Sequence, residues 1–512
     1  MNPWATPLAL CTLSLNVPRG RVFLSSVTTT PVSDEVATTR RNNRVIGLLI
    51  AAAFVVILNE TIMSVALPSL THDLEITIAA AQWLTTGFLL TMAVVIPITG
   101  FLLQRFNTRP IFIAAMGLFS LGTLIAAVAP GFVLLLLGRI VQASGTAIMM
   151  PLLMTTLMTL VPAEKRGRMM GSVSIVISVA PAIGPTISGL ILHSLGWRWM
   201  FGLVLPIAII MLIIGIRSIS NVTEPRVVPL DVFSVILSAL GFGGLIFGIS
   251  RISEESTDGG VTLIVSLVVG ALSLAAFIIR QILLSRRDRA LLDLRTFQSP
   301  TFTAGILMMV VAMAALFGTI ILLPIYLTNV MGRDTIEIGL FMLPGGLVMG
   351  LMAPFVGRLF DRVGPRPLMI PGSIIVAGSL WFLATVGTAA GSSIWVLLGT
   401  HIVMSFGLAL LFTPLFTVSL GAVRPALYSH ASAIVGTVQQ VAGAIGTALF
   451  ITILSVQSQA LLAGGATAGA AVAGGVSQAF LVGACIATAL ILIAPFIGKP
   501  ADMPEGGAPM GH

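Results

Sequence analysis

The segment GFLLQRFNTRP runs from Gly100 to Pro110, and the segment GRLFDRVGPRP runs from Gly357 to Pro367. Both fit the pattern G-x-L-x-x-R-x-x-x-R-P, in which a Gly, a Pro and two Arg recur at the same offsets. Each copy follows directly after a long apolar run. The simplest explanation is that the chain contains two homologous halves, and that each copy marks the loop after the second helix of its half.

The composition around these segments is strongly apolar. Of the 512 residues, 57% are hydrophobic and only 9% are charged, whereas a typical soluble domain contains about 25% charged residues. The net charge of +8 is spread thinly along the chain, which argues against a phosphate-binding face. This composition excludes a soluble enzyme, a disordered protein and an ordinary nucleic-acid binder. We expect a polytopic membrane protein surrounded by the lipid bilayer.

A helix needs about 20 predominantly apolar residues to cross the hydrocarbon core of a membrane. The chain contains fourteen such runs, which are too long and too uniformly apolar for β-barrel strands. We expect spans at 45–68, 82–103, 110–129, 132–155, 170–192, 199–219, 229–250, 261–284, 302–329, 337–357, 368–388, 393–418, 429–455 and 477–498. The expected fold is all-α, with two six-helix bundles and two helices inserted between them.

These spans give the expected domain organisation. The N-terminal bundle covers residues 45–219, an inserted two-helix hairpin covers 229–284, and the C-terminal bundle covers 300–498. A tail over residues 1–44 lacks the basic-then-apolar order of a secretory signal, and a short tail covers 499–512. Repeated bundles of this kind form a site near the bilayer midplane in many secondary transporters.

Basic residues predict the orientation, because Lys and Arg are enriched in cytoplasmic loops. If the N-terminus is cytoplasmic, most basic residues fall in inner segments, and Arg198, Arg251 and Arg333 fall in outer ones. We therefore expect a protein of the cell membrane with both termini in the cytoplasm.

Three further patterns lie within the spans. LNETIMSVALP, from Leu58 to Pro68, places an acid in the first span. Arg139, Gln142 and Gly145 form an R-x-x-Q-x-x-G pattern in the fourth span, and APAIGPTISG, residues 180–189, lies in the fifth. Together with the repeated loops, these patterns resemble the signatures of the major facilitator superfamily, specifically its fourteen-span drug–proton antiporter branch.

The resemblance covers the chain from about residue 45 to residue 498. It implies a monomeric multidrug efflux transporter, associated with antibiotic resistance, that exports hydrophobic or cationic compounds in exchange for protons by alternating access. No enzyme activity, cofactor or metal site is expected. Two alternatives stay open: an exporter of a specific metabolite or siderophore, and, from a different class, a proton-channel subunit of a membrane redox complex.

The chain departs from the family signatures at two places. Asn59 replaces the family's first-span aspartate, and the acid Glu60 follows one residue later. In the first loop copy Gln104 replaces the family's acid, whereas the second copy keeps Asp361. In the family this acid helps to latch the cytoplasmic gate, so the resemblance supports a latch in the second half and leaves the first half in doubt.

Glu60 is the only acidic residue expected deep inside a span, and Arg139 is the only basic one. An ionised carboxylate is costly in hydrocarbon, so such a group faces a cavity, has a partner or stays protonated. A carboxyl group of this kind can bind a proton on one side of the membrane and release it on the other. We expect Glu60 and Arg139 to couple transport to protons. The alternative is that both are structural and tether neighbouring helices.

Substrate-binding residues are expected where polar or aromatic side chains interrupt the apolar spans. Such groups offer charge, stacking or hydrogen bonds within an otherwise apolar pocket. A lone His in a membrane helix more often serves packing, which is the alternative for His401. The expected set is Asn59, Glu60, Trp83, Gln142, His401 and Gln440.

Gating residues are expected in the fifth span and in the repeated loops. A proline removes a backbone donor and bends a helix, while a glycine lets a neighbouring backbone approach closely. Ordinary close packing uses the same residue types, so the gating role rests on the resemblance. The expected set is Arg105, Arg109, Pro181, Gly184, Pro185, Gly189, Asp361 and Arg362.

Overall fold

The computed structural model describes residues 32–221, 229–250, 260–387 and 392–498. Every regular element within these ranges is helical, in agreement with the expected all-α fold. Contacts divide the chain into residues 1–42 and residues 43–512, and the arrangement below is that of the second unit. The expected tail 499–512, most of the expected tail 1–44, and Arg251 lie outside the described residues.

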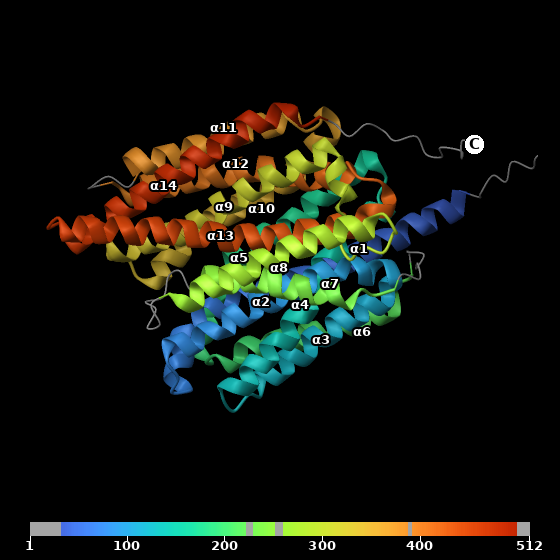
Figure 1. Cartoon of the computed structure of the whole chain (residues 1–512), viewed down its shortest axis with the longest axis horizontal. Helices are drawn as coiled ribbons and strands as arrows, with labels where there is room; N and C mark the ends of the chain where they lie inside the picture. The colour runs from blue at the N-terminus through green and yellow to red at the C-terminus, as the bar shows by residue number, and fades with distance from the viewer. Residues whose placement is uncertain (1–31, 222–228, 251–259, 388–391, 499–512) are drawn as a thin grey trace, which may run out of the picture. The chain divides into compact units, whose positions relative to one another are not determined.

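Fourteen α-helices fill the described ranges (Figure 1). They are α1 (Val32–Asp73), α2 (Ile78–Arg105), α3 (Thr108–Ala127), α4 (Phe132–Leu160), α5 (Arg166–Ser194), α6 (Arg198–Ser218), α7 (Val232–Ser250), α8 (Val261–Ser285), α9 (Pro300–Asn329), α10 (Thr335–Val363), α11 (Arg366–Phe382), α12 (Ile394–Gly421), α13 (Tyr428–Ala463) and α14 (Ala468–Ile493). Short helical turns lie between or after them: η1 (Ala163–Lys165), η3 (Leu294–Gln298), η4 (Leu383–Gly387), η5 (Pro425–Leu427) and η6 (Ala494–Phe496).

Thirteen of these helices are long and apolar enough to cross a membrane. The fourteenth, α5, meets the same test when its two segments, which meet at a 40° bend between Pro181 and Thr186, are taken as one span. Prolines in this stretch explain the bend, because each removes a hydrogen bond of the helix backbone. The prediction of fourteen helical spans is confirmed.

Some helix ends differ from the expected spans because capping, and not hydropathy, determines them. Helix α14 begins at Ala468, well before the expected residue 477, since the Thr467 side chain accepts a hydrogen bond from the Ala470 amide. The first turns of α14 are rich in Gly and Ala and are only weakly apolar. Helix α13 likewise continues to Ala463, beyond the apolar run that predicted it.

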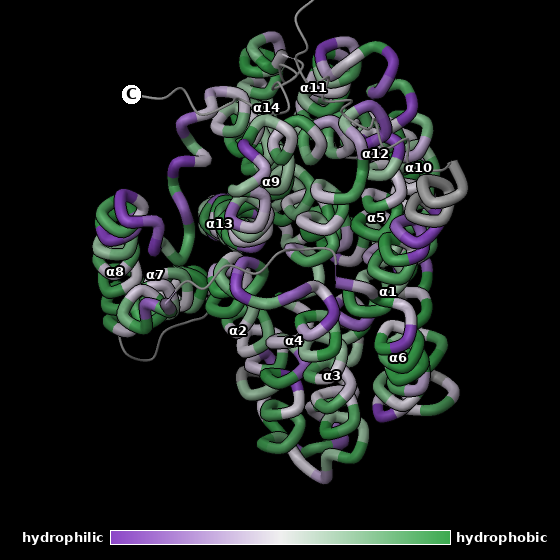
Figure 2. Tube along the Cα trace, turned by 90° about the vertical axis from the view of Figure 1, so that its right-hand side faces the viewer, coloured by the Kyte–Doolittle hydropathy of each residue, from purple (hydrophilic) through white to green (hydrophobic). Residues whose placement is uncertain are grey.

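The two halves meet along two helix pairs that correspond in the repeat. Helix α10 ends in the second loop copy and packs against α5 of the N-terminal half. Helix α2 ends in the first loop copy and packs against α13 of the C-terminal half. Figure 2, which looks along the helices, shows both pairs side by side.

The inserted helices α7 and α8 pack against each other, and α7 also contacts α2 and α13. A methyl group at Gly244 would lie 3.0 Å from the Gly270 Cα, so small residues allow the close pairing of α7 and α8. Trp83 of α2 lies beside Phe247 of α7, with ring centroids 5.6 Å apart. The hairpin therefore stands against the α2–α13 pair.

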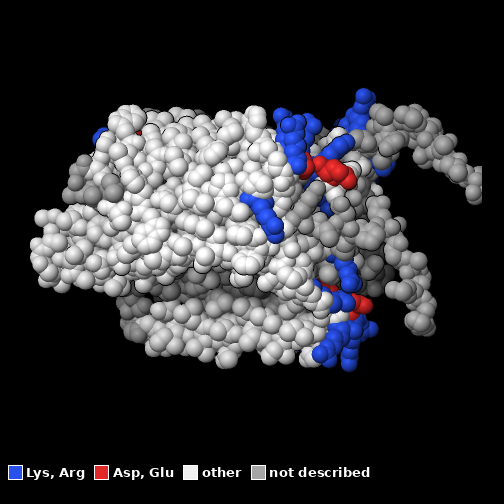
Figure 3. Space-filling view, turned by 90° about the horizontal axis from the view of Figure 1, so that it is seen from above, with Lys and Arg blue, Asp and Glu red and all other residues white. Residues whose placement is uncertain are grey.

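Basic residues concentrate at one end of the helices. Figure 3 shows Lys and Arg gathered at one end of the face in view, while most of the remaining surface is uncharged. Contacts between distant segments place the loop copies at a common end. Asp361 of the second copy binds the backbone of Gly167, and the neighbouring Arg166 has its Cζ 5.5 Å from the Tyr428 ring centroid. Gln104 of the first copy contacts His430 in the same turn of α13 as Tyr428. We call this the basic end.

An ion pair joins the two helices of the hairpin at the basic end. Arg280 of α8 donates two hydrogen bonds to Asp231, which precedes α7, at 2.7 and 2.8 Å. The hydrogen bonds from Arg280 hold the pKa of Asp231 below its usual range. This bidentate geometry fixes the direction in which α8 leaves the hairpin.

The hairpin is also tied to the linker that follows it, residues 286–299. Gln281 of α8 donates to Ser234 Oγ at 2.8 Å, and its side-chain oxygen accepts from the amides of Leu291 and Leu292 at 2.7 and 3.1 Å. Gln281 is fully buried, so these bonds satisfy an amide that has no access to water.

The Asp231–Arg280 pair predicts a small, pH-dependent contribution to stability. Asp231→Asn is expected to lower the Tm of the detergent-solubilised protein by about 1–2 °C, because a partly exposed ion pair contributes ~1 kcal/mol or less. Since Arg280 lowers the pKa of Asp231, the contribution of the ion pair to the free energy of unfolding is complete above about pH 4. It is lost as the pH falls further and Asp231 becomes protonated. Thermal unfolding at neutral pH and at about pH 3 measures both effects.

Glu75→Gln is the matched control, because Glu75 is an exposed carboxylate. It should leave the Tm unchanged. An Asp231→Asn effect of the same size at both pH values would contradict the role of the ion pair.

Candidate functional site

Helices α1, α3 and α4 share a buried polar network around Arg139, whose side chain is 1% exposed. The Arg139 Nη1 donates to Gln142 Oε1 at 2.6 Å and to Asn59 Oδ1 of α1 at 3.5 Å. Gln142 in turn donates to Thr123 Oγ1 of α3 at 2.7 Å. The spacing of three residues on α4 places Gln142 beside the guanidinium, so it orients Arg139 while Thr123 orients Gln142.

An aromatic ring covers the face of the same guanidinium. The Arg139 Cζ lies 4.0 Å from the centroid of the Phe88 ring of α2. A desolvated cation over an aromatic face is stabilised by about 2 kcal/mol, and the planar guanidinium combines this stacking with in-plane hydrogen bonds. Helix α2 therefore joins the network without a polar side chain.

Glycines allow the helices around this network to approach closely. A methyl group at Gly145 would lie 2.3 Å from the Ala115 carbonyl oxygen of α3, and one at Gly122 would lie 2.3 Å from the Gln142 backbone nitrogen. The R-x-x-Q-x-x-G pattern thus combines a cation, the amide that orients it and the glycine that brings α3 within reach.

Glu60 lies on α1 next to this network and remains half-buried. Its charge and that of Arg139 act on each other. Successive residues on a helix point about 100° apart, and Asn59 is the one that turns inward, 2% exposed, to accept from Arg139. Asn59 is therefore the direct hydrogen-bond acceptor of Arg139, while the acid Glu60 lies beside it.

Helix α1 packs against α5 immediately after Glu60. A methyl group at Gly184 would lie 2.3 Å from Thr61 Oγ1, and this hydroxyl lies 3.5 Å from the Ala180 carbonyl oxygen. Ser188 donates to the Ile62 carbonyl oxygen at 2.9 Å. The glycine and the small polar residues of the APAIGPTISG segment thus connect the site on α1 to the helix that crosses to the other half.

At the basic end, Asp361 of α10 binds the N-terminus of α5. Its two carboxylate oxygens accept from the amides of Gly167 and Arg168, both at 2.8 Å. A carboxylate at a helix N-terminus also interacts favourably with the helix dipole. A methyl group at Gly357 would lie 2.2 Å from the Gly167 carbonyl oxygen, so the two backbones touch. This contact holds the two halves together at the basic end, and we call it the Asp361 latch.

Three of the expected substrate-binding residues lie outside the network around Arg139. Trp83 is 38% exposed and lies against the inserted helix α7. His401 is buried between α12 and α10 and stacks on the Phe341 ring, with centroids 5.9 Å apart. Gln440 of α13 is half-buried and lies 3.6 Å from the Met92 sulfur of α2, across the two halves. The structure brings Asn59 and Gln142, but not these three, to Arg139.

The expected gating residues also separate in the structure. Gly189 is exposed, and a methyl group at this position would meet no atom of the described residues within 4 Å, so the expected close approach there is wrong; Gly189 lies beyond the contact with α1. Pro181 lies at the bend of α5, and the side chain of Pro185 is outside the described part. Exposed side chains at the basic end belong to Arg105, Arg109 and Arg362.

Thr123, Phe88 and Thr61 each contact the site but were not predicted from the sequence. A Thr or a Phe is common in an apolar helix, and no charge or spacing separates these residues from their neighbours. Only Thr61 had an indirect signal, because it lies opposite Gly184, a glycine of the segment already expected to allow a close helix contact.

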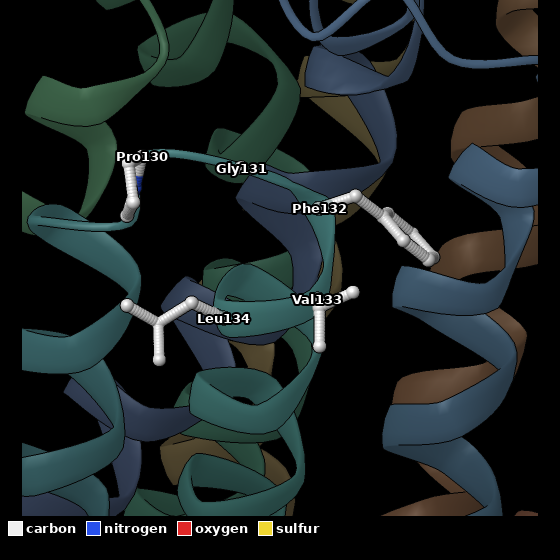
Figure 4. Close-up of a pocket in the computed structure, with 5 residues that line it drawn as sticks. All are labelled: Pro130, Gly131, Phe132, Val133 and Leu134. Carbon is white, nitrogen blue, oxygen red and sulfur yellow. The ribbon is translucent and has the colours of Figure 1, made fainter.

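A pocket of about 310 Å³ lies elsewhere, at the turn between α3 and α4 (Figure 4). Its lining contains no titratable group and consists of Pro130, Gly131, Phe132, Val133 and Leu134. It lies at the end of α3 opposite the basic end and contributes no residue to the network around Arg139.

Comparison with known proteins identifies relatives over most of the chain. Residues 49–447 match the family described as Major Facilitator Superfamily. The chain is 41% identical over 460 residues to the lincomycin resistance protein LmrB of Listeria monocytogenes, covering 89% of this chain and 96% of that protein. It is 29% identical over 415 residues to a multidrug resistance protein B homolog of Mycobacterium tuberculosis, covering 81% and 76%.

Solved structures with a similar fold include the human organic anion transporter MFSD10 (TETRAN), with a TM-score of 0.62, 12% identity, and coverage of 88% of this chain and 99% of that one. A double tryptophan mutant of XylE has a TM-score of 0.62 at 14% identity, covering 90% and 96%. At these identities the similarity concerns the fold alone. The family match and the relatives together show that this chain, a multi-pass membrane protein, belongs to the Major Facilitator Superfamily.

Proposed function

We propose that this protein is a proton-coupled antiporter that exports hydrophobic or cationic drug-like compounds across the cell membrane by alternating access. Relatives named for lincomycin resistance and multidrug resistance support drug substrates. The observation that carries the proton coupling is the half-buried carboxyl group of Glu60, set on α1 between the buried Arg139 network and the contact with α5. The partners in this scheme are protons and the exported compounds.

Proton exchange follows from competition for one carboxylate. A cationic compound and a proton both neutralise Glu60, so binding of one disfavours binding of the other. The nearby charge of Arg139 favours the ionised form of Glu60, while burial favours the protonated form. A group that binds and releases a proton in each cycle needs both states to be accessible, and these two effects act in opposite directions.

The same residues offer a route from the site to the gate. Helix α1 touches α5 at Thr61 and Gly184, and α5 is held at its N-terminus by Asp361 of the other half. A change of charge at Glu60 shifts the gate only if it favours one arrangement of these contacts over the other. We propose that the protonated and ionised states of Glu60 favour different positions of α1 against α5.

The orientation and domain division complete the proposal. We place the basic end and both termini in the cytoplasm, because Lys and Arg concentrate in cytoplasmic loops. The moving units are the bundles of residues 45–219 and 300–498, with the hairpin of residues 229–284 beside them. With this orientation, the Asp361 latch holds the cytoplasmic side closed.

Glu60→Gln is expected to abolish proton-driven export. Glutamine keeps the size and hydrogen-bonding capacity of the side chain but cannot exchange a proton. Proteoliposomes with an imposed pH gradient, and ethidium as the transported cation, measure this directly. The variant should fall to the rate of empty liposomes, while Glu75→Gln, which alters an exposed acid, should match the wild type. Unchanged gradient-driven transport in Glu60→Gln would remove this residue from the mechanism.

Arg139→Lys is expected to reduce ethidium transport at least ~10-fold, a loss of about 1.4 kcal/mol or more. Lysine keeps the charge but not the planar group that bonds to Gln142 while it stacks on Phe88. Arg217→Lys, at an exposed position of the basic end, is the matched control. Full transport by Arg139→Lys would show that charge alone suffices.

Asp361→Asn is expected to open the basic end more often. A neutral amide oxygen replaces a carboxylate that accepts two backbone hydrogen bonds, at a cost of about 1–1.5 kcal/mol, or roughly 5–10-fold in the opening equilibrium. The labelling rate of a thiol introduced by Met169→Cys, in a background without Cys11 and Cys485, reports this opening on α5.

Asp334→Asn is the matched control for this experiment, since Asp334 caps the opposite end of α10. It should leave the labelling rate unchanged. Equal labelling in Asp361→Asn and the parent protein would contradict the latch.

A further inference from the structure

Gln104 and His430 form a second polar contact between the two halves at the basic end. Gln104 lies in the last turn of α2 and His430 in the first turn of α13, where it is 3% exposed. The Gln104 Nε2 lies 2.7 Å from the His430 Nε2. An amide nitrogen only donates, so the ring nitrogen accepts and the histidine is neutral at this position.

This pair occupies the place in the repeat that corresponds to the Asp361 latch. Gln104 is the fifth residue of the first loop copy, and Asp361 is the fifth residue of the second. Each side chain reaches the first turn of a helix in the opposite half, α13 for Gln104 and α5 for Asp361. The geometry is thus repeated, but the chemistry differs: a neutral hydrogen bond replaces the bonds of a carboxylate.

The leading glycine of each loop copy lies at the corresponding contact. A methyl group at Gly100 would lie 3.3 Å from the His430 Nδ1 and 3.4 Å from the Ala433 Cβ. Gly357 meets the backbone of Gly167 in the same way. In the first half, therefore, the glycine leaves room for a ring, whereas in the second half it leaves room for a backbone.

The linker 286–299 closes over the Gln104–His430 pair. The Leu291 carbonyl oxygen would lie 3.5 Å from the methyl group at Gly100, on the same side as the ring. Gln281 of α8 holds the Leu291 amide, and the charge of Asp293, which is 3% exposed, acts on the His430 ring. The inserted hairpin is connected to the contact between the halves through this linker.

We propose that Gln104 and His430 are the positioning residues of a second, uncharged latch. This latch holds α2 of the N-terminal half against α13 of the C-terminal half at the basic end, and the linker of the inserted hairpin covers it. This inference rests on the proposed alternating-access function. It assigns the hairpin a role in gating: the end of α8 must move when α2 and α13 separate. Opening breaks the Gln104–His430 bond and exposes a ring that is now buried.

A double-mutant cycle with a labelling readout tests this latch. Ser432→Cys places an isosteric, buried reporter thiol two residues from His430 in the background without Cys11 and Cys485. Gln104→Ala and His430→Ala are each expected to raise the maleimide labelling rate about 5-fold, which corresponds to one hydrogen bond of ~1 kcal/mol. The double variant should label no faster than the faster single variant, because both changes remove the same bond.

Two further variants separate a latch from a general loss of structure. The exchange Gln104→His with His430→Gln keeps a neutral donor–acceptor pair and should restore slow labelling. Thr437→Ala removes a buried hydroxyl of α13 that bonds to the Ala433 carbonyl oxygen of the same helix, and it should have no effect. Fast labelling in the exchanged pair would overturn the proposal.

The linker is tested in the same assay. Gln281→Ala releases the Leu291 amide and should accelerate labelling in the Ser432→Cys background, but not further when His430→Ala is present. Additive effects in either cycle, or unchanged labelling in the single variants, would overturn the proposal. Labelling needs neither substrate nor a proton gradient. Labelling results that contradict the latch would therefore disprove the latch alone. A wild-type protein unable to transport ethidium would instead disprove the proposed function.

Discussion

A guanidinium buried within apolar helices must find partners for its charge and for its donors, and this requirement organises the N-terminal half. Gln142 and Asn59 accept from Arg139, and the ring of Phe88 covers its face. These partners come from α1, α2 and α4, so the position of one side chain constrains three helices. Because Asn59 supplies a neutral oxygen, the nearby acid, Glu60, is not committed to a direct bond with the cation and remains half-buried. The network thus sets the electrostatic environment of a carboxyl group that our account uses for proton exchange.

The contacts at the basic end repeat one geometry with two different chemistries. Both loop copies carry a glycine at the contact between the halves and a polar side chain that reaches the first turn of a helix in the other half. Asp361 engages the dipole and the free amides of α5, while Gln104 engages a neutral ring of α13 under the linker of the inserted hairpin. In our account a charge-dependent contact and a neutral contact therefore share the closing of one gate. The two contacts differ in their response to ionic strength, because salt screens the charged contact of Asp361 more strongly than the neutral contact of Gln104.

The fold was predictable because hydropathy and helix length alone define spans, and the repeated loop segment reveals the two halves. Capping by Thr467 shifted the start of α14, since hydropathy does not detect a weakly apolar first turn. Within the site, the sequence marked Arg139, Gln142 and Asn59 as candidates but did not predict that they form one hydrogen-bonded network. It did not predict that Asn59, and not Glu60, faces Arg139. Neighbouring residues on a helix point about 100° apart, and only the packing of the helix determines which of the two points inward. Trp83 was assigned to the substrate site because it is an aromatic side chain in an apolar span. Its actual partner, Phe247 of α7, lies far away in sequence, and no pattern linked the two residues.

The central claim is that Glu60 exchanges a proton for a cationic substrate. Isothermal titration calorimetry of tetraphenylphosphonium binding, in buffers of different ionisation enthalpy, counts the protons released when the cation binds. Our account predicts that the wild-type protein releases a substantial fraction of a proton, and at most about one, per bound cation near neutral pH, and that Glu60→Gln binds the cation with no release. Equal proton release by the two proteins, or none by the wild type across the pH range, would contradict it.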